Sequence, residues 1–123
     1  MDTSILIDRY CEAWSAPDAG RRAELLAAVW AVGATYTDPS VHAAGADELL
    51  AHVAKVQARR PGARVLRTSP VEGHHRIARF AWHVVLPDGS ALPEGLDIAF
   101  ISADGAMIER IIGFFGPLPR EAE

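Results

Sequence analysis

The sequence has little of several features that would define a protein's compartment. It holds a single cysteine, Cys11, in 123 residues, so no disulfide can form within the chain and a reducing compartment is expected. No apolar run reaches the roughly 18 residues of a membrane-spanning helix. The N-terminus, MDTSILIDRY, lacks the basic start and long apolar core of a signal peptide. We therefore expect a cytoplasmic protein without a membrane partner.

A strong positive charge is also missing. The formal net charge is -4, which argues against nucleic acid as a partner because phosphate binding needs a clustered positive surface. Four arginines do lie close together in the sequence, and the favoured interpretation is a solvated helix end and edge strand: Arg59, Arg60, Arg64 and Arg67. His74 and His75 are adjacent on or beside a strand and would point to opposite sides. They make a poor chelating pair, so no metal or other cofactor is expected.

Half of the residues are hydrophobic and 23% are charged, which is typical of a folded globular protein. At this length we expect one domain spanning residues 1–123. Helical spacing of apolar residues predicts helices near 3–15, 18–31 and 46–59. A short strand is expected near 34–40, followed by a loop, and strand patterns at about 64–71 and 75–86 precede a final hairpin. Three helices followed by a run of long strands indicate an α+β fold whose sheet curls over the helices.

The final hairpin, residues 95–116, organises the rest of the chain. It reads as two apolar strands joined by a glycine-containing turn at residues 102–105. Asp97 is the anomaly, because a carboxylate on a covered strand must be paired, hydrogen-bonded or protonated. A two-residue loop would put Asp97 on the face of Ile108, Arg110 and Ile112, whereas a three-residue loop would put it on another face: Met107, Glu109, Ile111, Gly113 and Phe115.

Four further residues are candidates for the site, and each also has an ordinary structural explanation. Tyr10 and Trp14 are four apart on one helix face, where they could be core aromatics or line a pocket. Asp38 ends a short strand before Pro39, and such a pair is often turn chemistry. His52 lies beside the apolar stripe of the third helix, where a lone histidine is more often a core or edge residue than a ligand.

The order and spacing of RYCEAW, ATYTDPS, the Gly45 helix start, GLDIAF and GFFGP resemble the SnoaL-like and ketosteroid-isomerase-like branch of the nuclear transport factor two-like superfamily. The resemblance covers nearly the whole chain. It implies a cone in which a curved antiparallel sheet wraps three helices around one deep, apolar cavity. The loop after Asp38 is shorter than in the family, the hairpin turn is one residue longer, and His52 replaces an expected pocket aromatic.

The resemblance also implies roles for single residues. Tyr10 falls at the oxyanion-binding tyrosine, Asp38 at the general base, and Asp97 at a protonated aspartic acid that donates a hydrogen bond. It favours the longer hairpin loop, which turns Ile111 and Phe115 inward with Asp97. The expected substrate-binding residues are Trp14, Trp30, His52, Phe80, Trp82, Val84, Ile111 and Phe115.

Two functional hypotheses follow. The first is an isomerase or polyketide cyclase that moves a proton next to a carbonyl of a small apolar molecule, with Asp38 or Asp97 as the acid/base. The alternative is a protein of the same fold that binds a hydrophobic ligand without chemistry. Burial should raise the pKa of Asp97 unless Arg110 reaches it; with the longer loop Arg110 points away and Glu109 nearby adds a like charge. Four apolar residues expected on the outer face of the sheet predict a homodimer: Ile98, Phe100, Ile112 and Phe114.

Overall fold

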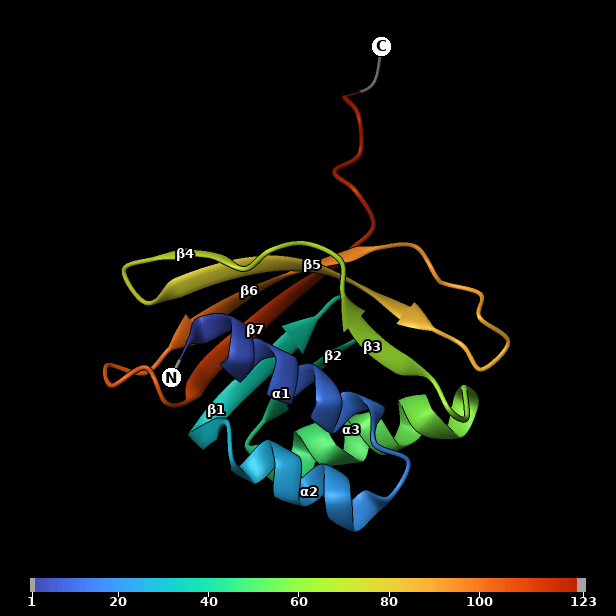
Figure 1. Ribbon diagram of the computed structural model, residues 1–123, viewed down its shortest axis with the longest axis horizontal. Coiled ribbons are helices and arrows are strands. Elements are labelled where there is room, and N and C mark those ends of the chain that lie inside the picture. Colours follow the sequence, from blue (N-terminus) through green and yellow to red (C-terminus); the bar gives the residue numbers. More distant parts are fainter. Residues whose placement is uncertain (1, 122–123) are drawn as a thin grey trace.

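A computed structural model describes residues 2–121, and within that range the chain forms three helices and seven strands (Figure 1). The helices are α1 (Thr3–Ser15), α2 (Ala19–Ala27) and α3 (Ala46–Arg59). The strands are β1 (Trp30–Asp38), β2 (Val41–Ala44), β3 (Arg64–Arg67), β4 (Glu72–His74), β5 (Ile77–Val85), β6 (Gly95–Ile101) and β7 (Ile108–Phe115). The expected α+β fold is confirmed.

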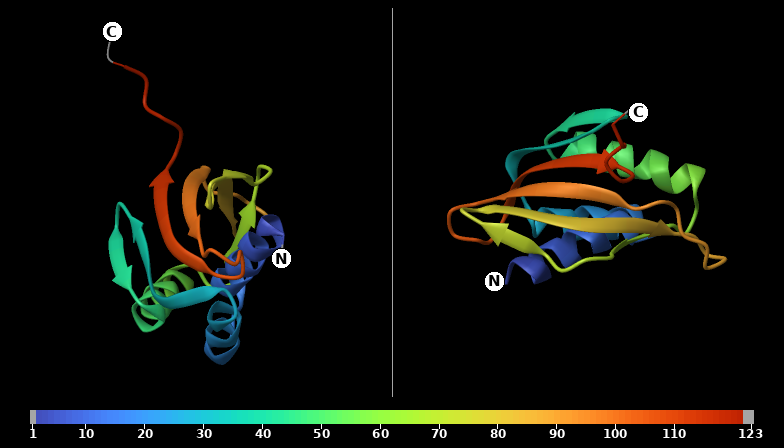
Figure 2. Two further views of the ribbon diagram at one scale, coloured as in Figure 1. Left: turned by 90° about the vertical axis from the view of Figure 1, so that its left-hand side faces the viewer. Right: turned by 90° about the horizontal axis from the view of Figure 1, so that it is seen from above.

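The strands form one mixed sheet in the order β2-β1-β7-β6-β5-β3, with β4 paired to β5. Figure 2 shows that the sheet is strongly curved and that the helices lie within its curve. The sheet is not purely antiparallel as expected, because β1 and β7 pair in parallel. This pairing places the end of β1 beside the end of β7, and so brings residues near Asp38 next to residues near Gly113.

The second helix ends earlier than its apolar pattern predicts. The prediction extended it to residue 31, but α2 stops at Ala27 and Trp30 opens β1. The Val29 carbonyl accepts a hydrogen bond of 2.7 Å from the Ile108 amide, and Trp30 pairs with Ile108. Pairing with β7 therefore overrides a local helical pattern, as tertiary contacts often do.

Other boundaries also differ from the sequence predictions. The expected loop after Pro39 contains β2, which pairs with β1 from Thr35↔Ala44 to Asp38↔Val41. The strand expected over 64–71 ends at Arg67, and the turn expected near residue 72 is β4. The chain reverses instead at His75 and Arg76, which both have positive φ.

The register of the final hairpin follows the longer of the two predicted loops. Asp97 pairs with Gly113, so these residues share a face with Ile111 and Phe115. An irregularity lies at the turn end, where Phe100 pairs with Arg110 but Ile101 pairs with Ile108. Glu109 is the extra residue of this bulge and is exposed. It does not lie on the covered face beside Asp97, contrary to the prediction.

The core fills the space between the helices and the inner face of the sheet. The fully buried residues are Leu6 and Ile7 of α1, Leu49 of α3, and Ile108 and Ile111 of β7.

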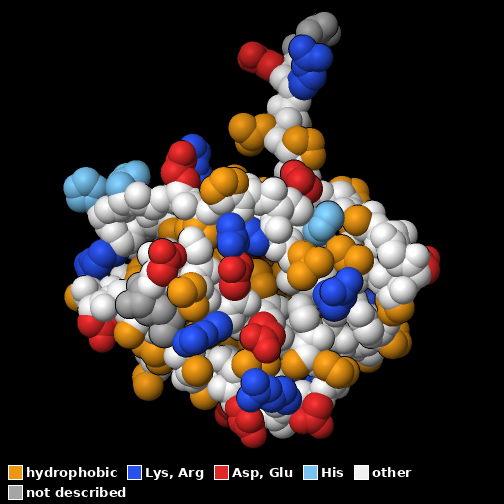
Figure 3. All heavy atoms as spheres, viewed as in Figure 1, with side chains coloured by type: hydrophobic (Ala, Val, Ile, Leu, Met, Phe, Trp, Pro, Cys, Tyr) orange, Lys and Arg blue, Asp and Glu red, His pale blue; other side chains and the backbone are white. Residues whose placement is uncertain are grey.

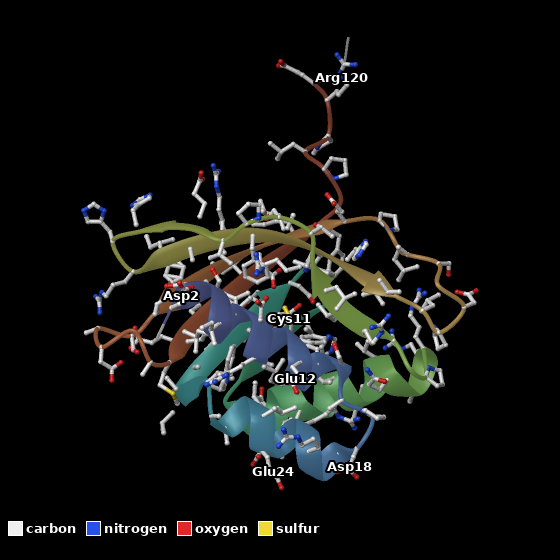
Figure 4. All side chains as sticks on the ribbon, viewed as in Figure 1. Asp2, Cys11, Glu12, Asp18, Glu24 and Arg120 are labelled. Carbon is white, nitrogen blue, oxygen red and sulfur yellow. The ribbon has the colours of Figure 1, made fainter. Side chains whose placement is uncertain are left out.

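On the face of the molecule that Figure 3 shows, acidic and basic side chains are interspersed over α1 and α2. Past β7 the chain leaves the body of the molecule, where Arg120 is labelled in Figure 4. Within residues 2–121, the helices are too short or too polar to cross a membrane.

Candidate functional site

A cavity of about 440 Å³ opens between α1, α3 and the inner face of the sheet. Its inner wall holds aromatic and acidic side chains, together with one cysteine, from the four elements α1, β1, β5 and β6: Tyr10, Cys11, Trp14, Tyr36, Asp38, Trp82 and Asp97. Figure 4 shows Cys11 directed from α1 toward the sheet, while its neighbour Glu12 lies on the outer side of the helix. A mostly apolar cavity with a few convergent polar groups is typical of a small-molecule site.

Asp97 is buried in this wall, with 4% of its surface exposed. Burial raises the pKa of its carboxyl to about 7, a hydrogen bond from Trp82 lowers it, and the negative charge of Asp38 raises it. Asp97 therefore keeps its proton up to about pH 7, whereas an ordinary aspartate loses it near pH 4. The like charge comes from Asp38 and not from Glu109 as predicted.

Trp82 determines which oxygen of Asp97 carries the proton. The indole Nε1 donates to Asp97 Oδ1 over 2.8 Å. Since an indole N–H can only donate, Oδ1 is the acceptor, and because the carbonyl oxygen is the better acceptor of a protonated carboxyl, the acid proton is assigned to Oδ2. The protonated carboxyl can then donate one hydrogen bond from Oδ2.

Two glycines make room for this pair. A Cβ on Gly113 would stand 2.7 Å from Asp97 Oδ1, and a Cβ on Gly95 would overlap the Trp82 ring. Both contacts would be closer than those that real Cβ atoms make. The position of that Gly113 Cβ would also lie 3.5 Å from Asp38 Cβ and 3.7 Å from the Tyr36 hydroxyl. The missing side chain at Gly113 thus lets two acids and a tyrosine meet around one point.

Asp38 ends β1 on the same strand face as Tyr36, because residues two apart on a strand point to one side. Its Oδ1 accepts hydrogen bonds from the Ser40 amide (2.7 Å), the Ser40 hydroxyl (2.7 Å) and the Val41 amide (3.1 Å). Its Oδ2 accepts one from the Tyr36 hydroxyl over 2.6 Å. Four donors match an ionised carboxylate, and Oδ2 retains a lone pair.

Tyr10 lies on the cavity wall with an unused donor. Its side chain is 2% exposed, and its hydroxyl has no hydrogen-bond partner within the described residues. Burial, together with the charges of Tyr36 and Asp97, raises the pKa of Tyr10 well above its ordinary value. Trp14 stands edge-on to it with ring centroids 6.4 Å apart, and the Trp14 Nε1 is likewise buried without a partner in residues 2–121.

Buried donors without partners cost free energy, of the order of 1–3 kcal/mol each. Tyr10 and Trp14 both line the cavity, so a ligand oxygen that came within hydrogen-bond distance of either buried donor would recover this cost. Trp30 also leaves its Nε1 without a partner among the described residues, but it stacks on Tyr10 behind the wall, with ring centroids 5.8 Å apart.

His52 faces the cavity from α3 and is half-buried. It stacks on Tyr36 with ring centroids 6.1 Å apart and meets Trp14 edge-on. Burial lowers the pKa of His52, which the charge of Asp38 opposes, so the ring is neutral at neutral pH. Cys11 is inert by comparison, because burial raises the pKa of its thiol to about 12.

The predicted site residues divide into two groups. Those on the cavity wall are Tyr10, Trp14, Asp38, His52, Trp82, Val84, Asp97 and Phe115. The other three are Trp30, Phe80 and Ile111, which are buried core residues and not wall residues. Their side chains point inward, as predicted, but they pack in the core and do not border the cavity. The alternation of a strand predicts which side chains point inward and does not separate core from cavity positions.

Sequence reasoning missed Tyr36, Ser40 and the two arginines at the end of α3, Arg59 and Arg60, all of which line the cavity. The Tyr-Thr-Asp pattern on a strand could have revealed Tyr36, because it puts the tyrosine and Asp38 on one face. The separation of Arg59 and Arg60 from the acids along the chain concealed their place at the same cavity.

The histidine pair at the β4–β5 turn does not separate as predicted. His74 Nδ1 and His75 Nδ1 lie 3.1 Å apart, since the positive φ of His75 takes it off the strand path. No group of three or more metal-ligating side chains occurs within residues 2–121.

No family model matches the sequence, and neither does any curated protein. The structure matches a proposed isomerase of the SnoaL-like family from Agrobacterium tumefaciens with a TM-score of 0.84 and 27% identity, covering 92% of this chain and 96% of that one. It also matches a nuclear transport factor two-like protein of unknown function from Exiguobacterium (TM-score 0.71, 20% identity, covering 92% and 99%). A third match is a proposed ketosteroid isomerase from Kribbella flavida (TM-score 0.64, 17% identity, covering 98% and 82%).

The fold is thus that of the cone-shaped α+β proteins with a cavity inside a curved sheet. Its fold is that of the nuclear transport factor two-like proteins, and the structure is similar to that of a SnoaL-like protein, as the motifs indicated.

Proposed function

We propose that the protein catalyses proton transfer at a carbon next to a carbonyl group, as an isomerase or cyclase of a small apolar molecule. The observation that carries the proposal is the grouping of Asp97, with a pKa raised to about 7, and Asp38, with four hydrogen-bond donors, around Gly113. Two acids in one cavity with opposite protonation states are a pattern of acid/base catalysis. The isomerase descriptions of two structural relatives agree with this chemistry.

In this mechanism the free lone pair of Asp38 Oδ2 removes a proton from the carbon beside the carbonyl. The electrons move onto the carbonyl oxygen, which becomes an enolate. The Tyr10 hydroxyl and the protonated Oδ2 of Asp97 then donate hydrogen bonds to that oxygen, worth a few kcal/mol in a dry site. Asp38 returns the proton to another carbon of the same molecule, which completes an isomerisation without a net change of atoms.

One observation favours the alternative of a non-catalytic binding protein. Three donors hold Asp38 Oδ1 in a turn with Ser40, and the exposed Asp88 makes the same turn with Ser90. Turn chemistry alone therefore explains part of the environment of Asp38. It does not explain the Tyr36 hydrogen bond or the position of Asp38 on the cavity wall.

The first test is the conversion of a β,γ-unsaturated ketosteroid to its conjugated isomer. The second is the exchange of solvent deuterium into simple ketones, which does not require the natural substrate. Asp38→Asn should lower turnover by at least ~10²-fold, the usual scale for losing a general base. Asp97→Asn should lose less, because its amide still donates to the enolate oxygen. Asp88→Asn is the matched control, since it changes the same kind of turn outside the cavity, and it should leave turnover unchanged.

Deuterium exchange no faster than in buffer, while a ketone still binds in the cavity, would favour the binding protein. Equal losses of turnover for Asp38→Asn and Asp88→Asn would show that the aspartate–serine turn is needed for stability and that Asp38 is not a general base.

We also propose that the protein is a homodimer through the outer face of the sheet and that it works in the cytoplasm on a small apolar molecule. Phe114 of β7 is 54% exposed, while Ile98, Phe100 and Ile112 are half-buried. Arg110 covers part of this face, with its guanidinium 5.6 Å from the centre of the Phe100 ring. A second copy would bury the remaining apolar surface.

A further inference from the structure

The mouth of the cavity carries positive charge that the proposed chemistry does not use. Arg59 ends α3 and Arg60 follows it, and both line the cavity whose inner wall holds the two acids. Neither forms a salt bridge with another of the described residues. Other arginines, including Arg64 and Arg76, also form no salt bridge within the part of the chain that the structure describes, but these do not line the cavity.

The charge of Arg59 reaches into the cavity. Together with burial, Arg59 and Lys55 lower the pKa of His52, whereas Asp38 opposes them. The charge of Arg59 therefore acts on the ring that stacks on Tyr36, where Asp38 has the larger effect of opposite sign. Glu94 lies on the wall as well, but it does not form a salt bridge with either arginine within residues 2–121.

The positions of the cavity-lining residues along α3 also give the distance between the two ends of the cavity. His52, Val56, and Arg59 with Arg60 repeat at helical spacing on the face of α3 that lines the cavity. With a rise of 1.5 Å per residue, Arg59 lies roughly 10 Å along the helix axis from His52. Asp38 influences His52 directly, so the reacting end of a ligand would lie near His52 and the opposite end near the arginines. The space between them is lined by apolar side chains, among them Val56, Val65 and Val84.

We propose that the natural substrate is an amphiphilic organic anion, with its carbonyl beside Tyr10 and Asp97 and an acidic group such as a carboxylate at Arg59 and Arg60. The apolar body between the two ends would span roughly 10 Å along α3. An anion would avoid the inner wall, where the carboxylate of Asp38 already stands, and guanidinium groups bind carboxylates in a bidentate geometry. The direction of binding rests on the proposed function, whereas anion recognition at the mouth does not.

Two fluorescent probes with the same apolar body test the proposal: anilinonaphthalene sulfonate, which is an anion, and N-phenylnaphthylamine, which is neutral. Wild type should bind the anion more tightly than the neutral probe. The double variant Arg59→Gln/Arg60→Gln should weaken anion binding about five- to tenfold at low salt and leave the neutral probe unchanged. The difference between wild type and variant should shrink as salt screens the charges.

Two controls accompany the double variant. Arg76→Gln removes one positive charge at the β4–β5 turn, which lies on the opposite side of the molecule from the end of α3 (Figures 1 and 2), and should leave both affinities unchanged. Arg59→Lys/Arg60→Lys keeps the charge and should restore most of the anion affinity.

An anion affinity that changes less than twofold in the Gln variant would overturn the proposal. So would an equal loss for both probes, which would indicate a structural role for the arginines. Because binding does not need the base, repeating the titration in Asp38→Asn separates this proposal from the proposed function: anion selectivity there should persist even if turnover assays fail.

Discussion

Replacing Asp97 by asparagine should stabilise the protein, and the gain should grow with pH. Asparagine has nearly the same shape, its carbonyl oxygen can still accept from Trp82 Nε1, and it cannot ionise. Burial raises the pKa of Asp97 from 3.8 to about 7 in the folded state. The unfolded chain therefore loses this proton near pH 4, while the folded protein keeps it until about pH 7.

The sign and size follow from this shift. Between about pH 4 and pH 7, wild type loses folding free energy as pH rises, because ionisation favours the unfolded state. At 1.36 kcal/mol per pKa unit, a shift of about three units amounts to at most about 4 kcal/mol above pH 7. This is a large part of the roughly 5–15 kcal/mol that stabilises an ordinary domain.

Urea unfolding of wild type and Asp97→Asn from about pH 4 to pH 8 measures this difference. The two proteins should be similarly stable near pH 4, and the variant should become progressively more stable up to about pH 7. Asp104→Asn is the control, because Asp104 is an exposed acid of the same hairpin whose pKa is lowered by hydrogen bonds from Ser102 and Ala106. Its difference from wild type should stay flat over this range. If the difference in unfolding free energy between wild type and Asp97→Asn also does not change with pH, Asp97 is not a buried acid that is protonated in the folded state.

Three further variants test the surroundings of this acid and the assembly. Gly113→Ala should cost about 1–3 kcal/mol and displace the Asp97 carboxyl, since the new Cβ would stand 2.7 Å from Oδ1; unchanged stability and turnover would contradict it. Trp82→Phe removes the hydrogen-bond donor that lowers the pKa of Asp97. In the same urea series, the difference in stability between this variant and Asp97→Asn should therefore keep growing to a pH about one unit higher than it does for wild type. Phe114→Lys should give a monomer in sedimentation at micromolar concentration, whereas Leu118→Lys, at another exposed apolar position, should not; a monomeric wild type would exclude the dimer.

The sequence predicted the parts of the fold that depend on local patterns. The first and third helices have the predicted bounds, and the second begins close to its predicted start, where Asp18 Oδ2 accepts from the Arg21 amide over 2.8 Å. The early end of α2 could not be predicted, because the segment around Trp30 is as apolar as a helix face and only its pairing with Ile108 makes it a strand. The parallel contact of β1 and β7 is likewise long-range, and local patterns do not contain it.

The part of the site that the sequence could predict is an acidic residue within an otherwise apolar strand. Asp97 stood out for this reason, and resemblance added Tyr10 and Asp38. Resemblance also favoured the longer hairpin loop, which is confirmed for Asp97 and Gly113, whereas the bulge that exposes Glu109 was not foreseen. The Trp82 hydrogen bond depends on two glycines that allow close approach, and such three-dimensional contacts are absent from a strand pattern.

The most direct test of the account is a carbon-detected NMR titration of the Asp97 side-chain carboxyl, identified by its loss in Asp97→Asn. The account predicts a midpoint near pH 7, and a higher midpoint in Trp82→Phe. Titration of Asp97 near pH 4, as for an exposed aspartate, would mean that the acid is ionised at neutral pH and cannot donate a hydrogen bond to an enolate.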